Sequence, residues 1–418
     1  MIKGYIISKK KLVKSFIWRI TQLGFKQGTV FLIFIISAKL LNKYEFGLYN
    51  YILAIILFLT LFCDFGISTA VSKYVAEYEV TNKRQQKYVL SNSLVLVIAL
   101  ATLTSIISLA ITPITKVQVS IMLSAIPLLY VIPISSVYDG TYRGLRRFKE
   151  LAIVTIIASI ITMVISIWLI LNFKLIGAII SQCFFYSLIS LFLFLKDSGV
   201  RFKFNREVLS NILNYSFTYG LALLGYYLFS RVGVIILGRF GYLEELATYE
   251  LINKVFLLLL LPFTILGQVI APDFTQMYAR KEYKHVYEKF KKYTLGSIIA
   301  GIILSSLLYL VIPNLIQVFF PAYYNELLFR LLPWVSIMFM LNVWATTVDS
   351  GIIIPTGFAY IMTYTYLILG LLYALLSILL IDNVGYMGII YLTSFATLLM
   401  VVIVRSIFWF KIYAISNN

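Results

Sequence analysis

The chain has 418 residues, of which 61% are hydrophobic and only 12% are charged. A soluble protein of this length carries about a quarter charged residues, so the composition excludes an ordinary soluble globular protein. The formal net charge of +18 suits a nucleic-acid binder, but the basic residues gather at the ends of apolar segments, which argues against a nucleic-acid partner.

Segments long enough to cross a bilayer, which takes roughly 20 mostly apolar residues, run along the whole sequence. They number twelve and fall at 16–41, 47–74, 88–112, 117–139, 150–172, 175–195, 213–238, 247–274, 294–318, 324–349, 357–381 and 386–410. No small-residue cleavage site follows the first apolar core, so this segment is predicted to be a retained helix and not a signal peptide. We therefore predict an all-α, multi-pass integral membrane protein.

Basic residues alternate along the connections between these segments. They are abundant before the first segment and in the second, fourth, sixth and eighth connections, and sparse in the others. Connections rich in Lys and Arg stay in the cytoplasm. The alternation thus predicts a cytoplasmic location for both termini and insertion in the cell (cytoplasmic) membrane.

The charged connection from Lys196 to Arg206 divides the twelve segments into two sets of six. A shift of 200 residues places Lys39 on Arg239 and Tyr49 on Tyr249, with the turns between helices in register. Internal repeats of this kind are common in transporters, and an even number of helices gives both halves the same orientation. We predict two six-helix bundles, residues 1–200 and 201–418, related as a parallel repeat around a central cavity.

Ionisable residues inside apolar segments mark a substrate or ion path, because a charge in hydrocarbon is costly unless it meets a partner or water. Arg19, Gln22 and Lys26 share one helical face, and Gly24 and Gly28 flank Lys26. A basic face turned to a cavity is one interpretation. In the alternative, Arg19 extends to the cytoplasmic surface and the glycines only pack helices.

The second half places Arg231 on the segment that corresponds to the first, and Lys254 on the next. Arginine suits a phosphate because its planar guanidinium can bind two oxygens. Lys254 lies near the outer end of its segment, where extension to the outer surface is the alternative. Asp64 is predicted to act as counter-ion to Lys26 or Arg231, or as a coupling site for a cation, with a structural salt bridge as the alternative.

Motifs for catalysis are missing from the sequence. It contains no phosphate-binding loop, and its single histidine, His285, lies in a basic connection. Cys63 and Cys183 lie within apolar segments and form no metal-ligand pattern. No catalytic residue, metal or cofactor is therefore predicted. Asp273 and Asp349 are expected to be solvated at helix ends, and 281–292 to form an amphipathic helix on the anionic inner leaflet.

Four short motifs together resemble the Wzx-type polysaccharide and O-antigen flippases, which are polysaccharide biosynthesis exporters of the multidrug/oligosaccharidyl-lipid/polysaccharide superfamily. They are FGLY at 46–49, DFGI at 64–67, KYVAEY at 73–78 and YRGLRRF at 142–148. The resemblance implies transfer of a polyprenyl-(pyro)phosphate-linked oligosaccharide from the cytoplasmic to the outer leaflet by alternating access. It also implies a cationic cavity, for which Lys26 and Arg231 are the matching positions here.

The substrate-binding residues expected on this basis are Lys26, Arg231, Lys254 and Arg19, with Asp64 as counter-ion or coupling residue. Expected partners are the polyprenyl-linked oligosaccharide, membrane lipids, a coupling Na⁺ or H⁺, and glycan-assembly enzymes. The related lipid II flippases usually have fourteen helices, which argues against that branch. One alternative is an ion-coupled antiporter of small cationic or amphiphilic compounds that depends on Asp64. Another is a membrane glycosyltransferase or polymerase, whose acids would come from Glu244, Glu245, Glu326 and Asp382.

Overall fold

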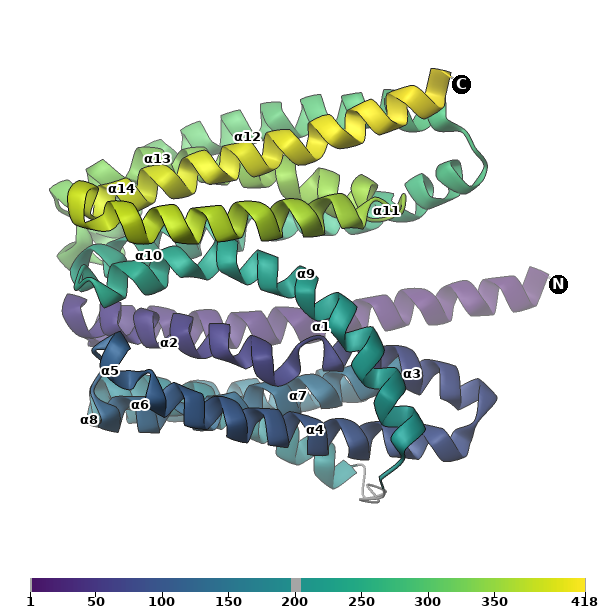
Figure 1. The fold of residues 1–418 in the computed structure, drawn as a ribbon, viewed down its shortest axis with the longest axis horizontal. Helices are drawn as coiled ribbons and strands as arrows, with labels where there is room; N and C mark the ends of the chain where they lie inside the picture. Colours follow the sequence, from purple (N-terminus) through teal and green to yellow (C-terminus); the bar gives the residue numbers. More distant parts are fainter. Residues whose placement is uncertain (1, 197–203, 418) are drawn as a thin grey trace. The chain divides into compact units, whose positions relative to one another are not determined.

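The computed structural model describes residues 2–196 and 204–417, and this part of the chain is helical, without a strand (Figure 1). It divides into two compact units, Met1–Leu223 and Leu224–Asn418. The predicted boundary between residues 200 and 201 lies outside the described residues, as do Arg201 and Lys203.

Eight helices and the beginning of a ninth form the first unit. They are α1 (Ile2–Leu40), α2 (Lys43–Asp64), α3 (Ile67–Thr81), α4 (Lys83–Ala110), α5 (Thr112–Thr115), α6 (Val119–Ala125), α7 (Pro127–Gly144), α8 (Phe148–Lys196) and α9 (Arg206–Arg239). Asn42 begins α2 with a capping box, in which its side chain and that of Glu45 each bond the other's backbone N–H. Helix α1 packs along α8, and α3 packs against α7.

The second unit contains the end of α9 and the remaining helices. These are α10 (Leu243–Leu259), α11 (Leu261–Ala279), α12 (Tyr283–Phe319), the short η1 (Pro321–Tyr323), α13 (Glu326–Val348), the π-helix η2 (Asp349–Ile353) and α14 (Ala359–Asn417). Its core gathers aromatic side chains, including Phe274, Phe290 and Phe408, from three of these helices. Within a bilayer, close van der Waals packing of such side chains stabilises the association of the helices, because lipid removes the hydrophobic driving force between them.

Ten helical stretches among the described residues are long and apolar enough to cross a membrane. Two of them, in α8 and α14, contain a residue with non-helical backbone, Lys174 (φ 48°) and Gly385 (φ 65°). Figure 1 shows the chain turning back on itself within α14. Each of these two stretches is long enough for two crossings, since a helix rises about 1.5 Å per residue. The count of twelve crossings and the cytoplasmic termini stay predictions.

The stretch 281–292 is not a separate surface helix, because it continues into α12. Val286 and Phe290 are buried in the core of the second unit, and the Phe290 ring centre lies 5.0 Å from that of Phe408. Tyr287 packs on Tyr413, with ring centres 5.6 Å apart. The prediction that this apolar face rests on the inner leaflet is therefore wrong: the face is covered by the end of α14.

Candidate functional site

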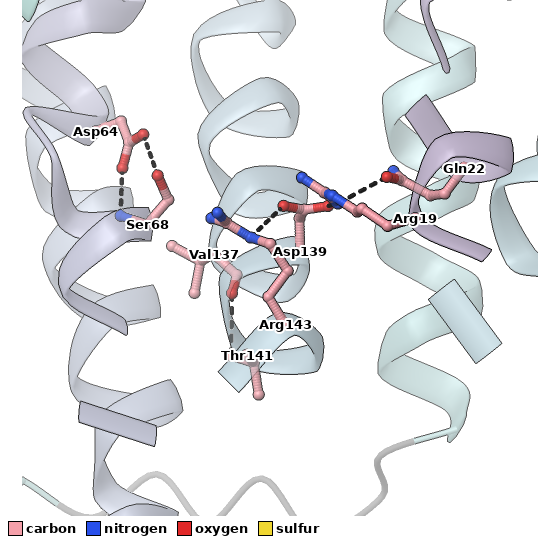
Figure 2. A network of polar contacts seen from close by, with 8 residues as sticks. All are labelled: Arg19, Gln22, Asp64, Ser68, Val137, Asp139, Thr141 and Arg143. Carbon is pink, nitrogen blue, oxygen red and sulfur yellow. Dashed lines mark hydrogen bonds and ion pairs between the residues drawn. The ribbon is translucent and has the colours of Figure 1, made fainter. Parts of the chain in front are cut away.

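The break between α2 and α3 positions Asp64. Phe65 and Gly66 both adopt left-handed backbone, with φ of 34° and 85°. The Asp64 carboxylate accepts hydrogen bonds from the Ser68 backbone N–H (2.8 Å) and from the Ser68 hydroxyl (2.7 Å), as Figure 2 shows. Asp64 thus caps the first turn of α3, a favourable place for an anion because the helix N-terminus carries partial positive charge.

A charged cluster of the first unit is centred on Asp139 of α7. Its Oδ1 lies 2.7 Å from Arg19 of α1, and its Oδ2 lies 2.8 Å from Arg143, one turn further along α7 (Figure 2). Arg19 also donates to the Gln22 side chain at 2.7 Å. Arg19 is therefore turned inward to a carboxylate and does not extend freely to the surface.

Lys26 lies next to this cluster. Its side chain is half-buried, and its ammonium lies 5.7 Å from the centre of the Tyr186 ring. The charges that act on it are those of Asp139, Arg19, Arg143 and Asp64. The structure thus brings together three of the predicted residues of the first half, Arg19, Lys26 and Asp64. In the described residues Asp64 and Lys26 do not come within ion-pair distance.

The two glycines that flank Lys26 face open space. A Cβ atom built on Gly24 or Gly28 meets no other atom within 4 Å. Within the described chain these glycines therefore allow no close helix contact, which was one of the two interpretations of the motif. They leave an uncovered strip along α1.

In the second unit, Arg231 of α9 and Lys254 of α10 are both half-buried. The charges that act on Lys254 are those of Arg231 and Glu250, which lies one helical turn before it. Glu250 is only 2% exposed, and its Oε1 has no hydrogen-bond partner in the described chain. The two cations predicted in the second half thus share one neighbourhood with a buried carboxylate.

Asp349 differs from the prediction. It is buried, and its Oδ1 pairs with Arg405 of α14 at 2.5 Å. The Arg405 guanidinium also lies 5.6 Å from the centre of the Trp344 ring. The expectation of a solvated Asp349 is wrong, because α13 continues into the π-helix η2 and carries this carboxylate into the core. Asp273 is exposed on α11, and its contact with water stays a prediction.

Three residues of these clusters were missed by the sequence reasoning. Asp139 stands at the last position of a predicted segment, Arg143 was assigned to a connection, and Glu250 was not singled out. The signal for the first two was present, since Asp139 and Arg143 are spaced i, i+4 and share a helix face. No group of three or more His, Cys, Asp or Glu able to hold a metal occurs among the described residues.

The fold and the ten long apolar helical stretches among the described residues define a multi-pass membrane protein. Solved structures with the same fold include the eukaryotic MATE transporter AtDTX14, with a TM-score of 0.61 and 12% identity over 96% of this chain and 99% of that one. A multidrug resistance MATE family transporter of the MOP superfamily, in an outward-facing conformation, has a TM-score of 0.60 and 15% identity over 98% and 97%. A MOP superfamily transporter from Pyrococcus furiosus, described by its reversed pocket polarity, has a TM-score of 0.56 and 14% identity over 98% and 97%.

The family follows from the sequence. The family model described as "Polysaccharide biosynthesis protein" matches residues 12–278, more than half of the chain, and the chain belongs to this family. No curated protein matches the sequence. The predicted family and the predicted all-α membrane fold are both confirmed.

Proposed function

We propose that this transporter is a flippase that moves a polyprenyl-(pyro)phosphate-linked oligosaccharide from the cytoplasmic to the outer leaflet of the cell membrane. The observation that carries the proposal is the cluster in the first unit, where Arg19, Lys26 and Arg143 surround the single bridging carboxylate of Asp139. The cations of this group outnumber its carboxylates, even with Asp64 included.

A surplus of fixed cations lowers the energetic cost of moving a charged diphosphate across the membrane. A diphosphate does not cross hydrocarbon unaided, because burying an unpaired charge costs many kcal/mol. Guanidinium groups that are already oriented by a carboxylate supply paired donors for phosphate oxygens without a large loss of side-chain entropy. The isoprenoid tail stays in lipid while the headgroup is transferred.

In this proposal, Arg231 and Lys254 of the second unit also bind the diphosphate. Both are half-buried in membrane-spanning helices, and no carboxylate of the described residues lies within ion-pair distance of Arg231. Transporters built from repeated bundles expose their site alternately to the two sides. We assign phosphate binding to these cations in each unit, and counter-ion or coupling roles to Asp64.

A second candidate function is an ion-coupled antiporter of small cationic or amphiphilic compounds. It is favoured by the environment of Asp64, whose carboxylate is bonded to the Ser68 hydroxyl and N–H and to no cation of the described residues. A carboxylate held in this way remains able to take up H⁺ or Na⁺. In this alternative Asp64 is essential, and Lys26 and Arg231 are dispensable.

The experiment compares cells that lack the gene with cells that express the wild type, Lys26→Ala, Arg231→Ala or Asp64→Ala at matched levels. Lys14→Ala, an exposed cation on the same helix as Lys26, is the control. We expect polyprenyl-linked oligosaccharide to accumulate without the gene and to be cleared by the wild type and the control, and not by the two cation variants. Clearance by both cation variants, together with loss of drug efflux in Asp64→Ala, favours the antiporter.

A further inference from the structure

A cavity of about 370 Å³ in the second unit lies outside the charged clusters described above. It is formed by α11, α12 and α13, and its walls are mostly apolar, with Phe263 and Leu266 on one side and Ala300 on another. Two lysines of α12, Lys289 and Lys292, lie at one end of it. Its volume is in the range of small-molecule sites.

The residues of α12 that line the cavity recur along one helix face. Lys289 and Lys292 are followed by Tyr293, Gly296 and Ala300, a spacing that keeps them on the same side. At about 1.5 Å per residue, the row from Lys289 to Ala300 is roughly 16 Å long. The cavity is thus an elongated groove, with two cations and a tyrosine at one end and small or apolar side chains along the rest.

Lys289 and Lys292 have no acidic partner among the residues that the structure describes. In the described residues no carboxylate lies within ion-pair distance of either ammonium, although both side chains are exposed. The lysines of the neighbouring face differ, since Lys291 is placed 4.3 Å from the centre of the Tyr287 ring. Lys289 and Lys292 therefore offer positive charge that no ion pair of the described residues neutralises, at the end of an apolar groove.

Two other grooves of the second unit lack this combination. One is lined by Tyr360, Tyr364 and Lys411, but its single lysine donates a hydrogen bond to the Tyr360 hydroxyl at 2.5 Å. The other, around Ser305 and Tyr309, contains no charged residue. The α11–α12–α13 groove therefore differs from the other two in the positive charge of its two lysines, which is complementary to an anionic headgroup.

We propose that the α11–α12–α13 groove binds one anionic phospholipid, with its phosphate on Lys289 and Lys292 and part of an acyl chain along Gly296 and Ala300. Lysines near a membrane surface attract anionic lipid, and their aliphatic stems lie along apolar walls while the ammonium reaches the headgroups. Tyr293 is suited to the headgroup depth of such a site. The proposal requires membrane insertion and is independent of the transported substrate.

Native mass spectrometry of the full-length protein, stripped of lipid in detergent, tests this site. The probes are phosphatidylglycerol, phosphatidylcholine, polyprenyl phosphate and soluble glycerol phosphate. For the wild type we expect one phosphatidylglycerol bound at least fivefold more tightly than phosphatidylcholine. Lys289→Glu combined with Lys292→Glu removes this preference, and the matched charge change Lys284→Glu with Lys291→Glu on other faces of α12 retains it.

A second variant tests the groove independently of charge. A Cβ on Gly296 meets no atom within 4 Å, so a side chain can start there without a clash at Cβ. Gly296→Leu is expected to occupy part of the groove and to reduce phosphatidylglycerol binding at least fivefold, with the melting temperature measured alongside as the folding control. Equal binding of the two phospholipids by the wild type overturns the proposal, as does equal loss in the matched charge control. Tighter binding of polyprenyl phosphate assigns the groove to a carrier lipid, and equal binding of glycerol phosphate assigns it to free anions; both overturn the phospholipid assignment.

Discussion

The two units hold their membrane-embedded charges in different ways. In the first, Asp139 fixes Arg19 and Arg143 by direct ion pairs, and Lys26 lies beside them. In the second, Arg231 and Lys254 have Glu250 nearby, but its Oε1 has no hydrogen-bond partner in the described chain. The first cluster is thus preorganised by direct ion pairs, whereas in the second no carboxylate of the described residues lies within ion-pair distance of Arg231.

The helix breaks of the two units differ as well. In the first, left-handed Phe65 and Gly66 separate α2 from α3, and Asp64 caps the new helix. In the second, α10 gives way to α11 at Leu260, whose backbone stays helical, and Pro262 follows in the first turn. Proline at a helix break removes a backbone hydrogen-bond donor. At the break in the first unit, the Asp64 carboxylate instead accepts a hydrogen bond from the backbone of the new helix. Of these two breaks, the first places a titratable carboxylate at the bend.

The largest effect is expected at the buried pair of the second unit. Arg405→Met leaves Asp349 buried and unpaired, and such a loss costs about 3–5 kcal/mol of stability. The melting temperature of the purified protein should fall strongly, and the double change Asp349→Leu with Arg405→Met should recover most of it. Unchanged stability with lost transport would instead place this pair in the transport machinery.

The bend of the first unit should be sensitive to packing against α9. A Cβ on Gly220 would lie 2.3 Å from Cδ1 of Phe65, so Gly220→Ala is expected to destabilise by about 1–3 kcal/mol through overpacking. Adding Phe65→Leu should relieve the clash and restore the melting temperature. Gly28→Ala, which meets no atom, is the control and should be neutral or slightly stabilising. An equal loss in both glycine variants would argue against the contact.

Binding of inorganic pyrophosphate, measured by calorimetry on the purified protein, tests whether the charged groups of the two units act differently on an anion. Asp139→Asn removes the competing carboxylate, so affinity should rise about tenfold, or about 1.4 kcal/mol. Arg231→Ala should lower affinity by a similar factor. A rise in affinity in Asp139→Asn and a fall in Arg231→Ala would support the difference between the units. A loss of affinity in both variants would mean that Asp139 only orients its arginines.

The smallest effect is expected at the cap of α3. Ser68→Ala removes the hydroxyl that donates to Asp64 but keeps the backbone N–H, and should cost about 1 kcal/mol. Ser72→Ala, one turn further along α3, serves as the control in the same thermal unfolding measurement. A cost no greater than that of the control would show that the hydroxyl does not hold Asp64 in place.

The sequence predicted those features that depend on composition and periodicity. Apolar length identified the spanning helices, and isolated charges pointed to Arg19, Lys26 and Asp64, which the fold brings together. Asp139 was missed because it stands at a segment end, Arg143 because it was assigned to a connection, and Glu250 because it stands beside a more conspicuous lysine. The burial of Asp349 depends on a π-helix, which is rare and at five residues too short to show a period in the sequence, and on Arg405, distant in the sequence.

Helix α9 begins in the first compact unit and ends in the second, and it is continuous from Arg206 to Arg239. Whether two co-expressed fragments of the protein reassemble is therefore expected to depend on where the chain is divided. A cut before Arg206 leaves this helix whole in one polypeptide, so complementation by two separately translated pieces has a structural basis there. A cut at Leu223 severs it and exposes new helix ends inside the bilayer, where unpaired backbone groups are not tolerated.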